Sequence, residues 1–283
     1  MNAPRPFPGL HRPLLFGHRG AGLRAPENTL PSFELALFLG ADVLELDVHR
    51  TRDGEVVVLH DATVDRTTNG HGPVRDLTLA ELEALDAGWH FTAPSGQQPF
   101  RGQGLSVPRL EEVLVRFGRA AFNIEIKARD PGLVRQVLEL LERTGVSRVV
   151  LAAEDDVIMR ELEAAAAGVP LGLSRGQVLD VVQRAWLGRS LERYAGRCLQ
   201  IPPRWRGVPV AARPVLKAAG RAGLEVHLWT VNDPVRAERW LRRGLDGIMS
   251  DDPGALADVV VREKERRAGR PLGRELATQR GTR

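Results

Sequence analysis

Short apolar runs typical of buried strands alternate with helical patterns along almost the whole chain. Between the runs lie segments whose apolar residues recur at helical spacing, and several of these segments end in glycine, a common helix C-cap. The eight runs that we predict as strands occupy residues 13–17, 42–49, 121–127, 148–154, 170–174, 197–202, 224–231 and 246–250. Strand–helix alternation with buried strands indicates a parallel sheet. Eight repeats favour a closed α/β barrel of the (β/α)8 TIM type over an open doubly wound sheet.

One long segment interrupts this alternation. About 70 residues separate the strands predicted at 42–49 and 121–127, and they include a β-like run, EVVVLHD, and a short helical pattern at about 78–86. We expect a small insertion after the second strand, at about 50–105, on the face where barrel loops build the active site. The helix of that unit is expected to resume at 106–118. The predicted organisation is an N-terminal extension at 1–12, a barrel at 13–261 and a basic, disordered tail at 262–283.

The positive charge of the chain is concentrated in this tail. Residues 262–283 hold eight Lys and Arg against three Asp and Glu, a net +5, so the other residues sum to −1 out of a total of +4. A basic tail can contact nucleic acid or anionic lipid, but a solvated terminus is the simpler interpretation. We therefore expect a small-molecule substrate and no nucleic-acid partner, and the sequence leaves the oligomeric state open.

Neither a membrane span nor a disulfide is expected. No apolar run approaches the ~20 residues that a membrane-spanning helix needs, and residues 1–13 lack the apolar core of a secretory signal peptide. The single cysteine, Cys198, excludes an intramolecular disulfide. These features predict a cytoplasmic enzyme with an ordinary apolar core.

Three carboxylates fall towards the carboxyl ends of predicted strands, the end at which barrel enzymes build their active sites. Glu45 and Asp47 lie two apart in the second strand, so both point to the same face, and Glu125 lies near the end of the third. Three converging carboxylates are costly to desolvate without a cation, and all-oxygen ligands favour a hard divalent ion. We predict one bound Mg²⁺ or Ca²⁺, with Mn²⁺ as a third option. The alternative is pairing with the many arginines of this chain.

Two histidines and two cationic side chains are expected at the same rim. His18 and Arg19 follow the first strand. His60 ends the EVVVLHD run, and Lys127 follows Glu125 at a spacing of two. A base and an acid on opposite sides of a phosphorus atom suit in-line cleavage of a phosphodiester, and imidazoles titrate near neutrality. Arg19 and Lys127 would supply positive charge to the phosphate oxygens.

Most other polar and aromatic residues near the strand ends are expected to have structural roles. Loop-fixing or helix-capping roles are predicted for Glu27, Asn28, Thr29, Asn232, Asp233, Ser250 and Asp251. Trp229, at the end of the seventh strand, is expected to line the substrate pocket, although core packing would explain it nearly as well. His227 has the same parity and should be a core histidine with satisfied hydrogen bonds. His49 could support the carboxylates of its own strand.

Four segments carry specific motifs in one order. They are HRG, PENT, E-x-D and HD within residues 17–61, E-x-K in NIEIK (123–127), WTVN in LWTVND (228–233), and GIMSDDP (247–253). Over residues 14–256 the chain resembles the glycerophosphodiester phosphodiesterase family. The resemblance implies a (β/α)8 barrel with an insertion after the second strand.

The resemblance also implies an activity, the hydrolysis of glycerophosphodiesters such as glycerophosphocholine or glycerophosphoethanolamine to glycerol 3-phosphate and an alcohol. The functional residues that it carries over are the catalytic His18 and His60, the phosphate-binding Arg19 and Lys127, and the metal ligands Glu45, Asp47 and Glu125. We expect His18 to act as base and His60 as acid. Gly17 and Gly20 would let the chain turn tightly around the phosphate.

Several alternatives stay open at this level. The two histidine roles could be exchanged, and the attacking group could be water or the substrate's own glycerol hydroxyl, through a cyclic phosphate. The substrate could instead be a lysophospholipid or an inositol phospholipid, which would need an exposed apolar lip on the insertion. The only bulky candidates for such a lip are Trp89, Phe91 and Phe100. A non-catalytic barrel that binds phosphate esters or a protein partner is disfavoured, because all seven residues of the expected site are present.

Overall fold

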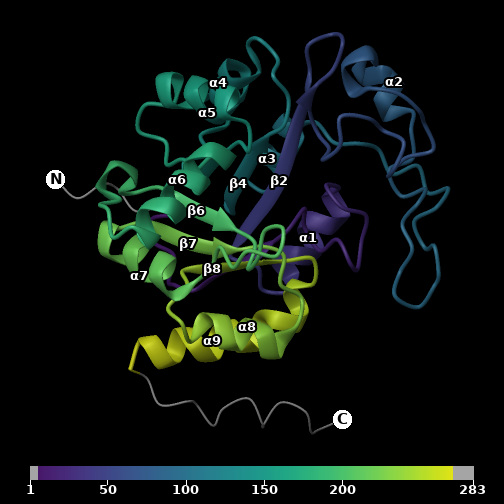
Figure 1. The fold of residues 1–283 in the computed structure, drawn as a ribbon. Coiled ribbons are helices and arrows are strands. Elements are labelled where there is room, and N and C mark those ends of the chain that lie inside the picture. Colours follow the sequence, from purple (N-terminus) through teal and green to yellow (C-terminus); the bar gives the residue numbers. More distant parts are fainter. Residues whose placement is uncertain (1–5, 270–283) are drawn as a thin grey trace, which may run out of the picture.

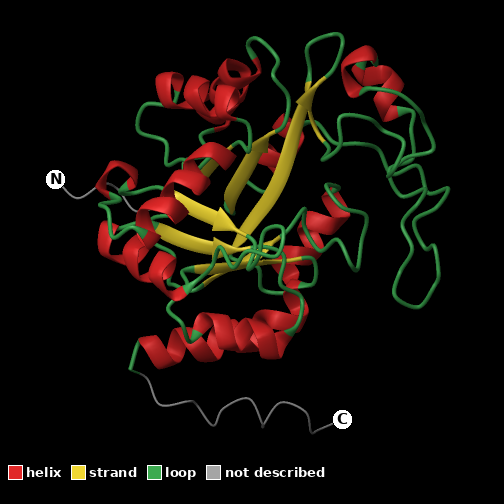
Figure 2. Cartoon of the chain, in the orientation of Figure 1, coloured by secondary structure: helices red, strands yellow, loops and turns green. Residues whose placement is uncertain are grey.

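The computed structural model describes residues 6–269 and shows a ring of parallel strands surrounded by helices (Figures 1 and 2). The strands follow the order β5-β4-β2-β1-β8-β7-β6. Their bounds are β1 (Leu14–Gly17), β2 (Val43–Arg50), β4 (Ala121–Ile126), β5 (Val149–Ala152), β6 (Cys198–Ile201), β7 (Glu225–Leu228) and β8 (Gly247–Ser250). All these neighbours pair in parallel, as the strand–helix alternation predicts.

The ring closes between β5 and β6 through two bridging residues rather than a full strand. Leu171 pairs with Leu151 of β5, and Gly172 pairs with Cys198 of β6, both in parallel. The strand predicted at 170–174 is therefore reduced to its centre, because Ser174 already forms the N-cap of the next helix and accepts a hydrogen bond from Gln177 N. The (β/α)8 barrel is confirmed.

Helices lie around the outside of the ring, and one short helix, α2, lies in a projecting segment instead (Figures 1 and 2). They are α1 (Leu30–Phe38), α2 (Leu79–Glu83), α3 (Leu110–Arg116), α4 (Leu133–Thr144), α5 (Asp156–Ala165), α6 (Arg175–Trp186), α7 (Arg213–Ala222), α8 (Pro234–Leu241) and α9 (Pro253–Arg267). Two 3₁₀ turns, η1 (Val74–Asp76) and η2 (Glu192–Tyr194), complete the set. In β2, the alternate residues Leu44, Leu46 and Val48 are fully buried and belong to the core between the ring and the helices. Their neighbours Glu45 and Asp47 consequently face the inside of the barrel.

The segment between β2 and α3 projects from one side of the barrel (Figure 1, right). It begins with β3 (Val56–Val58), which pairs antiparallel with β2, and it contains η1 and α2. It has a small apolar core of its own, made of Val57, Leu59, Val64, Val74, Leu82, Ala87 and Val107. The antiparallel return of β3 brings its carboxyl end, and the following His60, back to the rim where β2 carries its carboxylates.

The N-terminal end of the barrel is sealed by a residue that the sequence assigns to an extension. Phe7 is fully buried and packs edge-on against Phe16 of β1, with 5.7 Å between ring centroids. At the other end of the chain, α9 continues to Arg267, and Glu263 is buried between Arg266 and Arg267. The prediction of a disordered tail from residue 262 is wrong for 262–267, and residues 270–283 lie outside the described part. No helix within residues 6–269 is long and apolar enough to cross a membrane.

Candidate active site

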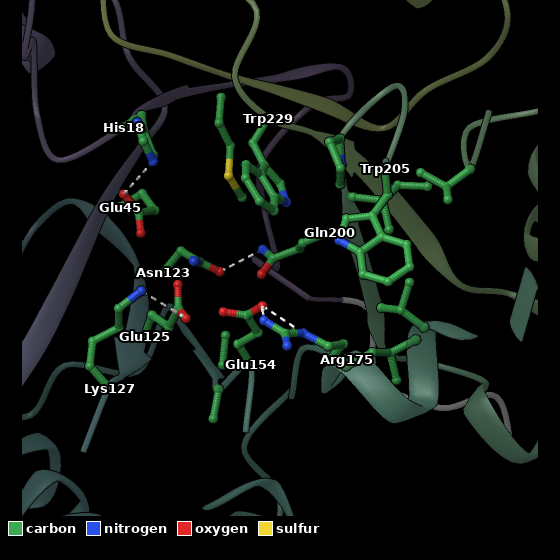
Figure 3. A pocket seen from close by; sticks show the side chains of 18 of the residues that line it. His18, Glu45, Asn123, Glu125, Lys127, Glu154, Arg175, Gln200, Trp205 and Trp229 are labelled. Atoms are coloured by element: carbon green, nitrogen blue, oxygen red, sulfur yellow. Dashed lines mark hydrogen bonds and ion pairs between the residues drawn. The ribbon is translucent and has the colours of Figure 1, made fainter. Parts of the chain in front are cut away.

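The register between β2 and β4 brings the predicted carboxylates together. Glu45 stands beside Asn123, and Asp47 stands beside Glu125. Oxygens of Glu45, Asp47 and Glu125 lie within 4.8 Å of one another. Glu45 and Asp47 are only 3% and 1% exposed. The three side chains form an acidic cluster at the carboxyl end of the ring. Figure 3 shows Glu45 and Glu125 of this cluster.

Cationic and amide groups surround this acidic cluster. The Arg19 backbone N–H donates to Glu45 Oε2 at 2.8 Å, and the Arg19 guanidinium lies 3.3 Å from Asp47 Oδ2. Lys127 Nζ lies 3.1 Å from Glu125 and 3.4 Å from Asp47. The pairing with arginine that was considered as an alternative therefore occurs, but only in part. Two cations face three carboxylates.

The incomplete neutralisation appears as a raised pKa. Burial, reinforced by the charge of Asp47, raises the pKa of Glu45 to about 8. Burial also raises the pKa of Glu125, against the opposing charge of Lys127. With a pKa of about 8, Glu45 would hold a proton at neutral pH, and a divalent cation can take the place of that proton. The donors are all hard oxygens, so the cluster fits Mg²⁺, Ca²⁺ or Mn²⁺.

His18 stands on one side of the acidic cluster and is held by an aspartate from the other end of the chain. Its Nδ1 lies 2.7 Å from Asp251 Oδ1, and its Nε2 lies 4.0 Å from Glu45 Oε2. Asp251 in turn accepts a hydrogen bond from Asn232 Nδ2 at 2.9 Å. Burial lowers the pKa of His18, but the charge of Glu45 and the hydrogen bond to Asp251 outweigh it, so the pKa is raised.

His60 also faces an aspartate, but a local one. Its Nδ1 lies 2.6 Å from Asp61 Oδ1, and Asp61 Oδ2 accepts a 2.6 Å hydrogen bond from Arg66 Nε. Although burial opposes it, these hydrogen bonds lower the pKa of Asp61 to about 2. His49 Nε2 lies 3.1 Å from the His60 carbonyl oxygen, so it supports His60 rather than the carboxylates of its own strand.

The loop that carries His18 and Arg19 has no room for larger residues. A Cβ on Gly17 would lie 2.7 Å from Ala36 Cβ, and Gly20 has φ +88° with Ser32 Oγ 2.4 Å from where its Cβ would be. Arg19 itself adopts the left-handed region at φ 53°. This turn aims the Arg19 backbone N–H at Glu45 and its guanidinium at Asp47, which supports the expected role of the two glycines.

The polar neighbours predicted as caps have more varied roles. Asp233 caps α8 as predicted, accepting from Arg236 N at 2.7 Å. The cap of α9 is Asp252, which leaves Asp251 free to pair with His18. The prediction of a cap for Asp251 is therefore wrong, and Asn232 holds Asp251 instead of capping a helix.

Two residues of the PENT motif fix the site from behind. Asn28 Nδ2 donates to Asp47 Oδ2 at 3.0 Å. Glu27 accepts hydrogen bonds from both Arg19 and Arg66, which links the two histidine-bearing loops. Thr29 occupies the N-cap position of α1, but its hydroxyl donates to Pro26 O rather than to the helix. The loop-fixing roles predicted for Glu27 and Asn28 are thus confirmed.

A cavity of about 230 Å³ opens beside the acidic cluster. Its polar side includes His18, Arg19, Glu45, His60, Glu125 and Lys127. Trp229, 41% exposed, and Trp205 line another side of the cavity (Figure 3). Leu179 also lines the cavity. The structure therefore brings all eight predicted site residues to one place, seven of them in the cavity wall and Asp47 within the acidic cluster.

The cavity also holds polar residues that sequence reasoning missed. Gln200 Nε2 donates to Asn123 Oδ1 at 2.7 Å, and Arg175 Nε donates to Glu154 Oε1 at 2.9 Å. The signal for Asn123 was available, because it lies two residues before Glu125 on the same face of β4. Trp205 lies in a loop whose sequence carries no strand or helix periodicity, so nothing pointed to it.

This closed (β/α)8 barrel carries, at the carboxyl ends of its strands, the groups that metal-assisted hydrolysis of a phosphate ester needs: an acidic cluster, two histidines and two cations. The family model of the glycerophosphoryl diester phosphodiesterase family matches residues 18–255. The glycerophosphodiester phosphodiesterase of Caldanaerobacter subterraneus subsp. tengcongensis is 34% identical over 253 residues, covering 87% of this chain and 97% of that protein. A Bacillus subtilis glycerophosphodiester phosphodiesterase is 33% identical, covering 88% of this chain and 86% of that protein.

Comparison with solved structures points to the same family. The crystal structure of a glycerophosphodiester phosphodiesterase from Agrobacterium tumefaciens is similar with a TM-score of 0.68 and 32% identity, covering 87% of this chain and 99% of that one. A phosphodiesterase from Oleispira antarctica is similar with a TM-score of 0.69 and 25% identity, covering 88% of this chain and 97% of that one. The chain belongs to the glycerophosphoryl diester phosphodiesterase family and is a phosphoric diester hydrolase.

Proposed function

We propose that the protein hydrolyses glycerophosphodiesters, such as glycerophosphocholine or glycerophosphoethanolamine, to glycerol 3-phosphate and an alcohol, in the cytoplasm. The observation that carries this proposal is the acidic cluster flanked by two histidines, each with an aspartate on its Nδ1. The Oleispira antarctica relative was solved in complex with the product sn-glycerol 3-phosphate, which supports the same product here.

The acidic cluster is proposed to hold one divalent ion through Glu45, Asp47 and Glu125. Bound there, the ion would supply positive charge to a phosphate oxygen and lower the cost of the developing negative charge. Arg19 and Lys127, which already face the cluster, would bind the remaining phosphate oxygens. Asn28 keeps Asp47 oriented through its amide.

The two histidines are proposed to move the protons. An aspartate on Nδ1 favours the tautomer with the proton on that nitrogen, which leaves Nε2 as the atom that acts on the substrate. His18 would take the proton of the attacking hydroxyl at Nε2, and His60 would deliver a proton from Nε2 to the departing alkoxide. The attacking group is water, or the substrate's own glycerol hydroxyl through a cyclic phosphate. Trp229 and its apolar neighbours would hold the alcohol.

The test is release of glycerol 3-phosphate from glycerophosphocholine by the purified protein. It is run with EDTA and then with added Mg²⁺, Ca²⁺ or Mn²⁺, beside His18→Ala. We expect release that depends on the metal and is lost in the variant. Absence of release with every metal would contradict the proposal.

A lysophospholipid is a second candidate substrate, favoured by one observation. The insertion does not supply the apolar lip that a lipid substrate would need there, because Phe91 packs on Phe100 and Trp89 lies under Arg101, all outside the cavity wall. A lip exists elsewhere. Trp205 and Leu179 line the cavity and are still 39% and 47% exposed.

The Trp205 half of this lip lies in a loop suited to a lipid headgroup region, and Leu179 lies in α6. Trp205 and Val208 exchange two backbone hydrogen bonds of 2.9 Å, which makes a tight hairpin, and Val208 is 53% exposed. Residues 202–213 contain three arginines and no acidic residue. Activity on lysophosphatidylcholine above that on glycerophosphocholine, reduced selectively by Trp205→Ala, would put this substrate first. Equal effects of Trp205→Ala on both substrates would remove it.

A further inference from the structure

A second cluster of potential metal ligands lies at the end of the barrel opposite the catalytic cavity. Cys198 is the first residue of β6, Glu225 is the first residue of β7, and the two are paired in the parallel register. His227 lies two residues further along β7, on the same face as Glu225. The three side chains come from strand beginnings, whereas the catalytic residues lie at strand ends. We name Cys198, Glu225 and His227 the basal cluster.

The basal cluster is buried and its polar atoms are incompletely bonded. Cys198 and His227 are fully buried and Glu225 is 7% exposed. His227 Nε2 and Glu225 Oε2 both lack a hydrogen-bond partner in the described structure. The expectation that His227 is a core histidine is confirmed, but the expectation that its hydrogen bonds are satisfied is wrong for Nε2. Two orphaned polar atoms aimed at each other in an apolar interior are costly unless something binds them.

The spacing of these atoms fits a metal better than it fits a hydrogen bond. His227 Nε2 and Glu225 Oε2 are 3.4 Å apart, beyond the usual range for N–H···O. Two ligands held about 2.05 Å from a tetrahedral zinc ion lie about 3.4 Å apart, which is the separation found here. One ligand atom from each of the three residues falls within 4.8 Å of the others, so a small contraction would close the set.

The charges around the cluster are compatible with a dication. Arg12 pairs with Glu225 Oε1, which leaves Oε2 free. Asp246 is close enough for its charge to act on Cys198 and Glu225. A zinc ion with one thiolate and one glutamate is neutral, and Asp246 offsets Arg12. The other nitrogen of His227 lies 3.4 Å from Gln200 Nε2, which donates to Asn123 Oδ1. Rotation of both amides, Gln200 and Asn123, would present the Gln200 oxygen to Nδ1–H and keep the Gln200–Asn123 hydrogen bond.

We propose that Cys198 Sγ, Glu225 Oε2 and His227 Nε2 bind one zinc ion, with a water molecule as fourth ligand. The thiol would release its proton on binding, and the thiolate with imidazole and carboxylate favours zinc over the hard ions expected in the catalytic site. The ion would join β6 to β7. Through the Arg12–Glu225 pair it would also hold the N-terminal segment whose Phe7 seals the barrel.

Cobalt substitution tests the site directly, because the chain has a single cysteine. The full chain is unfolded in EDTA, refolded with Co²⁺, and its absorption spectrum recorded. We expect a thiolate-to-cobalt charge-transfer band in the near ultraviolet that saturates at about one basal site per chain, together with the strong visible bands of tetrahedral Co²⁺. The all-oxygen catalytic site cannot give a thiolate band. No such band in the wild-type chain at excess Co²⁺ would overturn the proposal, whatever the catalytic activity.

Two variants separate the sites. Cys198→Ala should lose the thiolate band, and Asp47→Asn, which removes a catalytic carboxylate, should keep it. Zinc measured by mass spectrometry in Asp47→Asn refolded with Zn²⁺ should approach one ion per chain, and added Zn²⁺ should raise its Tm. Zinc content near zero in that variant would also overturn the proposal, and this readout does not depend on Cys198→Ala folding.

Discussion

The two histidines of the site face aspartates at nearly the same distance, yet the two pairs are built differently. His18 and Asp251 are 2.7 Å apart and join the ends of β1 and β8, the first and last strands of the barrel. His60 and Asp61 are 2.6 Å apart and adjacent in the sequence. The first pair exists only in the closed barrel. The second is local, and it is oriented from outside by Arg66. The same His–Asp arrangement is thus fixed in one case by the global fold and in the other by a network of surface residues.

Removing either imidazole should have the largest effect. We expect His18→Ala and His60→Ala each to lower kcat by about 10²–10⁴-fold, the range of general acid–base catalysis. A p-nitrophenyl phosphodiester, whose leaving group needs no proton, should restore much of the rate to the variant that lacks the acid. We expect that variant to be His60→Ala.

Steady-state rates of the two variants on both substrates check this assignment. Recovery of His18→Ala instead would exchange the two roles. Near-normal kcat of either variant on glycerophosphocholine would contradict the assignment altogether.

Substituting the two aspartates should have the second-largest effect on activity. Asp251→Asn and Asp61→Asn should each lower kcat/KM by about 10–100-fold, as outer partners of active-site groups do. The larger loss is expected for Asp251, because its pair is the more buried. Since Asp251 and Glu45 raise the pKa of His18, Asp251→Asn should lower that pKa and move the acid limb of the pH–rate profile to lower pH. Asp233→Asn, which alters only the cap of α8, is the control. An acid limb that stays in place would mean that His18 does not titrate in catalysis.

These residues also show which parts of the site can be predicted from the sequence and which cannot. Glu45, Asp47 and Glu125 could be placed together, because period-two alternation and the shared end of parallel strands decide which way they point. Asp251 could not be assigned, because a helix cap and a histidine partner have the same signature just after a strand. The choice depends on the register in which Gly17 stands beside Ser250, a long-range fact that local patterns do not contain.

Two errors in the predicted elements have the same origin. PLGLS (170–174) has the composition of a strand, but Ser174 is needed for the N-cap of α6, so only its centre bridges to the ring. The charged run after residue 261 has the composition of a tail, but Val259 and Val260 are buried and Glu263 pairs with two following arginines, so α9 continues. In both cases tertiary packing overrides the local composition.

Loosening the surface network should have a smaller effect. Arg66→Ala removes the hydrogen bonds to Asp61 and Glu27. It should lower kcat/KM by about tenfold or less, because His60 keeps its contact with Asp61 but Asp61 is no longer held in place by Arg66. The matched control is Arg52→Ala, which removes an exposed pair with Glu81 in the same insertion. Kinetics of the two variants on one substrate make the comparison. Equal values for both would show that Arg66 acts only as a surface ion pair.

The smallest effect is expected in acid stability. The folded pKa of Asp61, about 2, lies below the ordinary value of 3.8, so its ionised form stabilises the fold. That contribution is complete above about pH 4 and is lost as the pH falls towards 2. Because the Asp61–Arg66 pair is partly exposed, it should amount to about 1 kcal/mol or less. Urea unfolding of the wild type, Asp61→Asn and the exposed control Asp76→Asn between pH 5 and about pH 2.5 measures it. Asp61→Asn should make the fall in unfolding free energy towards low pH less steep, and Asp76→Asn should leave it unchanged. Some decline should remain in both variants, because the His18–Asp251 pair still contributes. A decline that is equally steep in Asp61→Asn would show that the local pair orients its histidine without stabilising the fold.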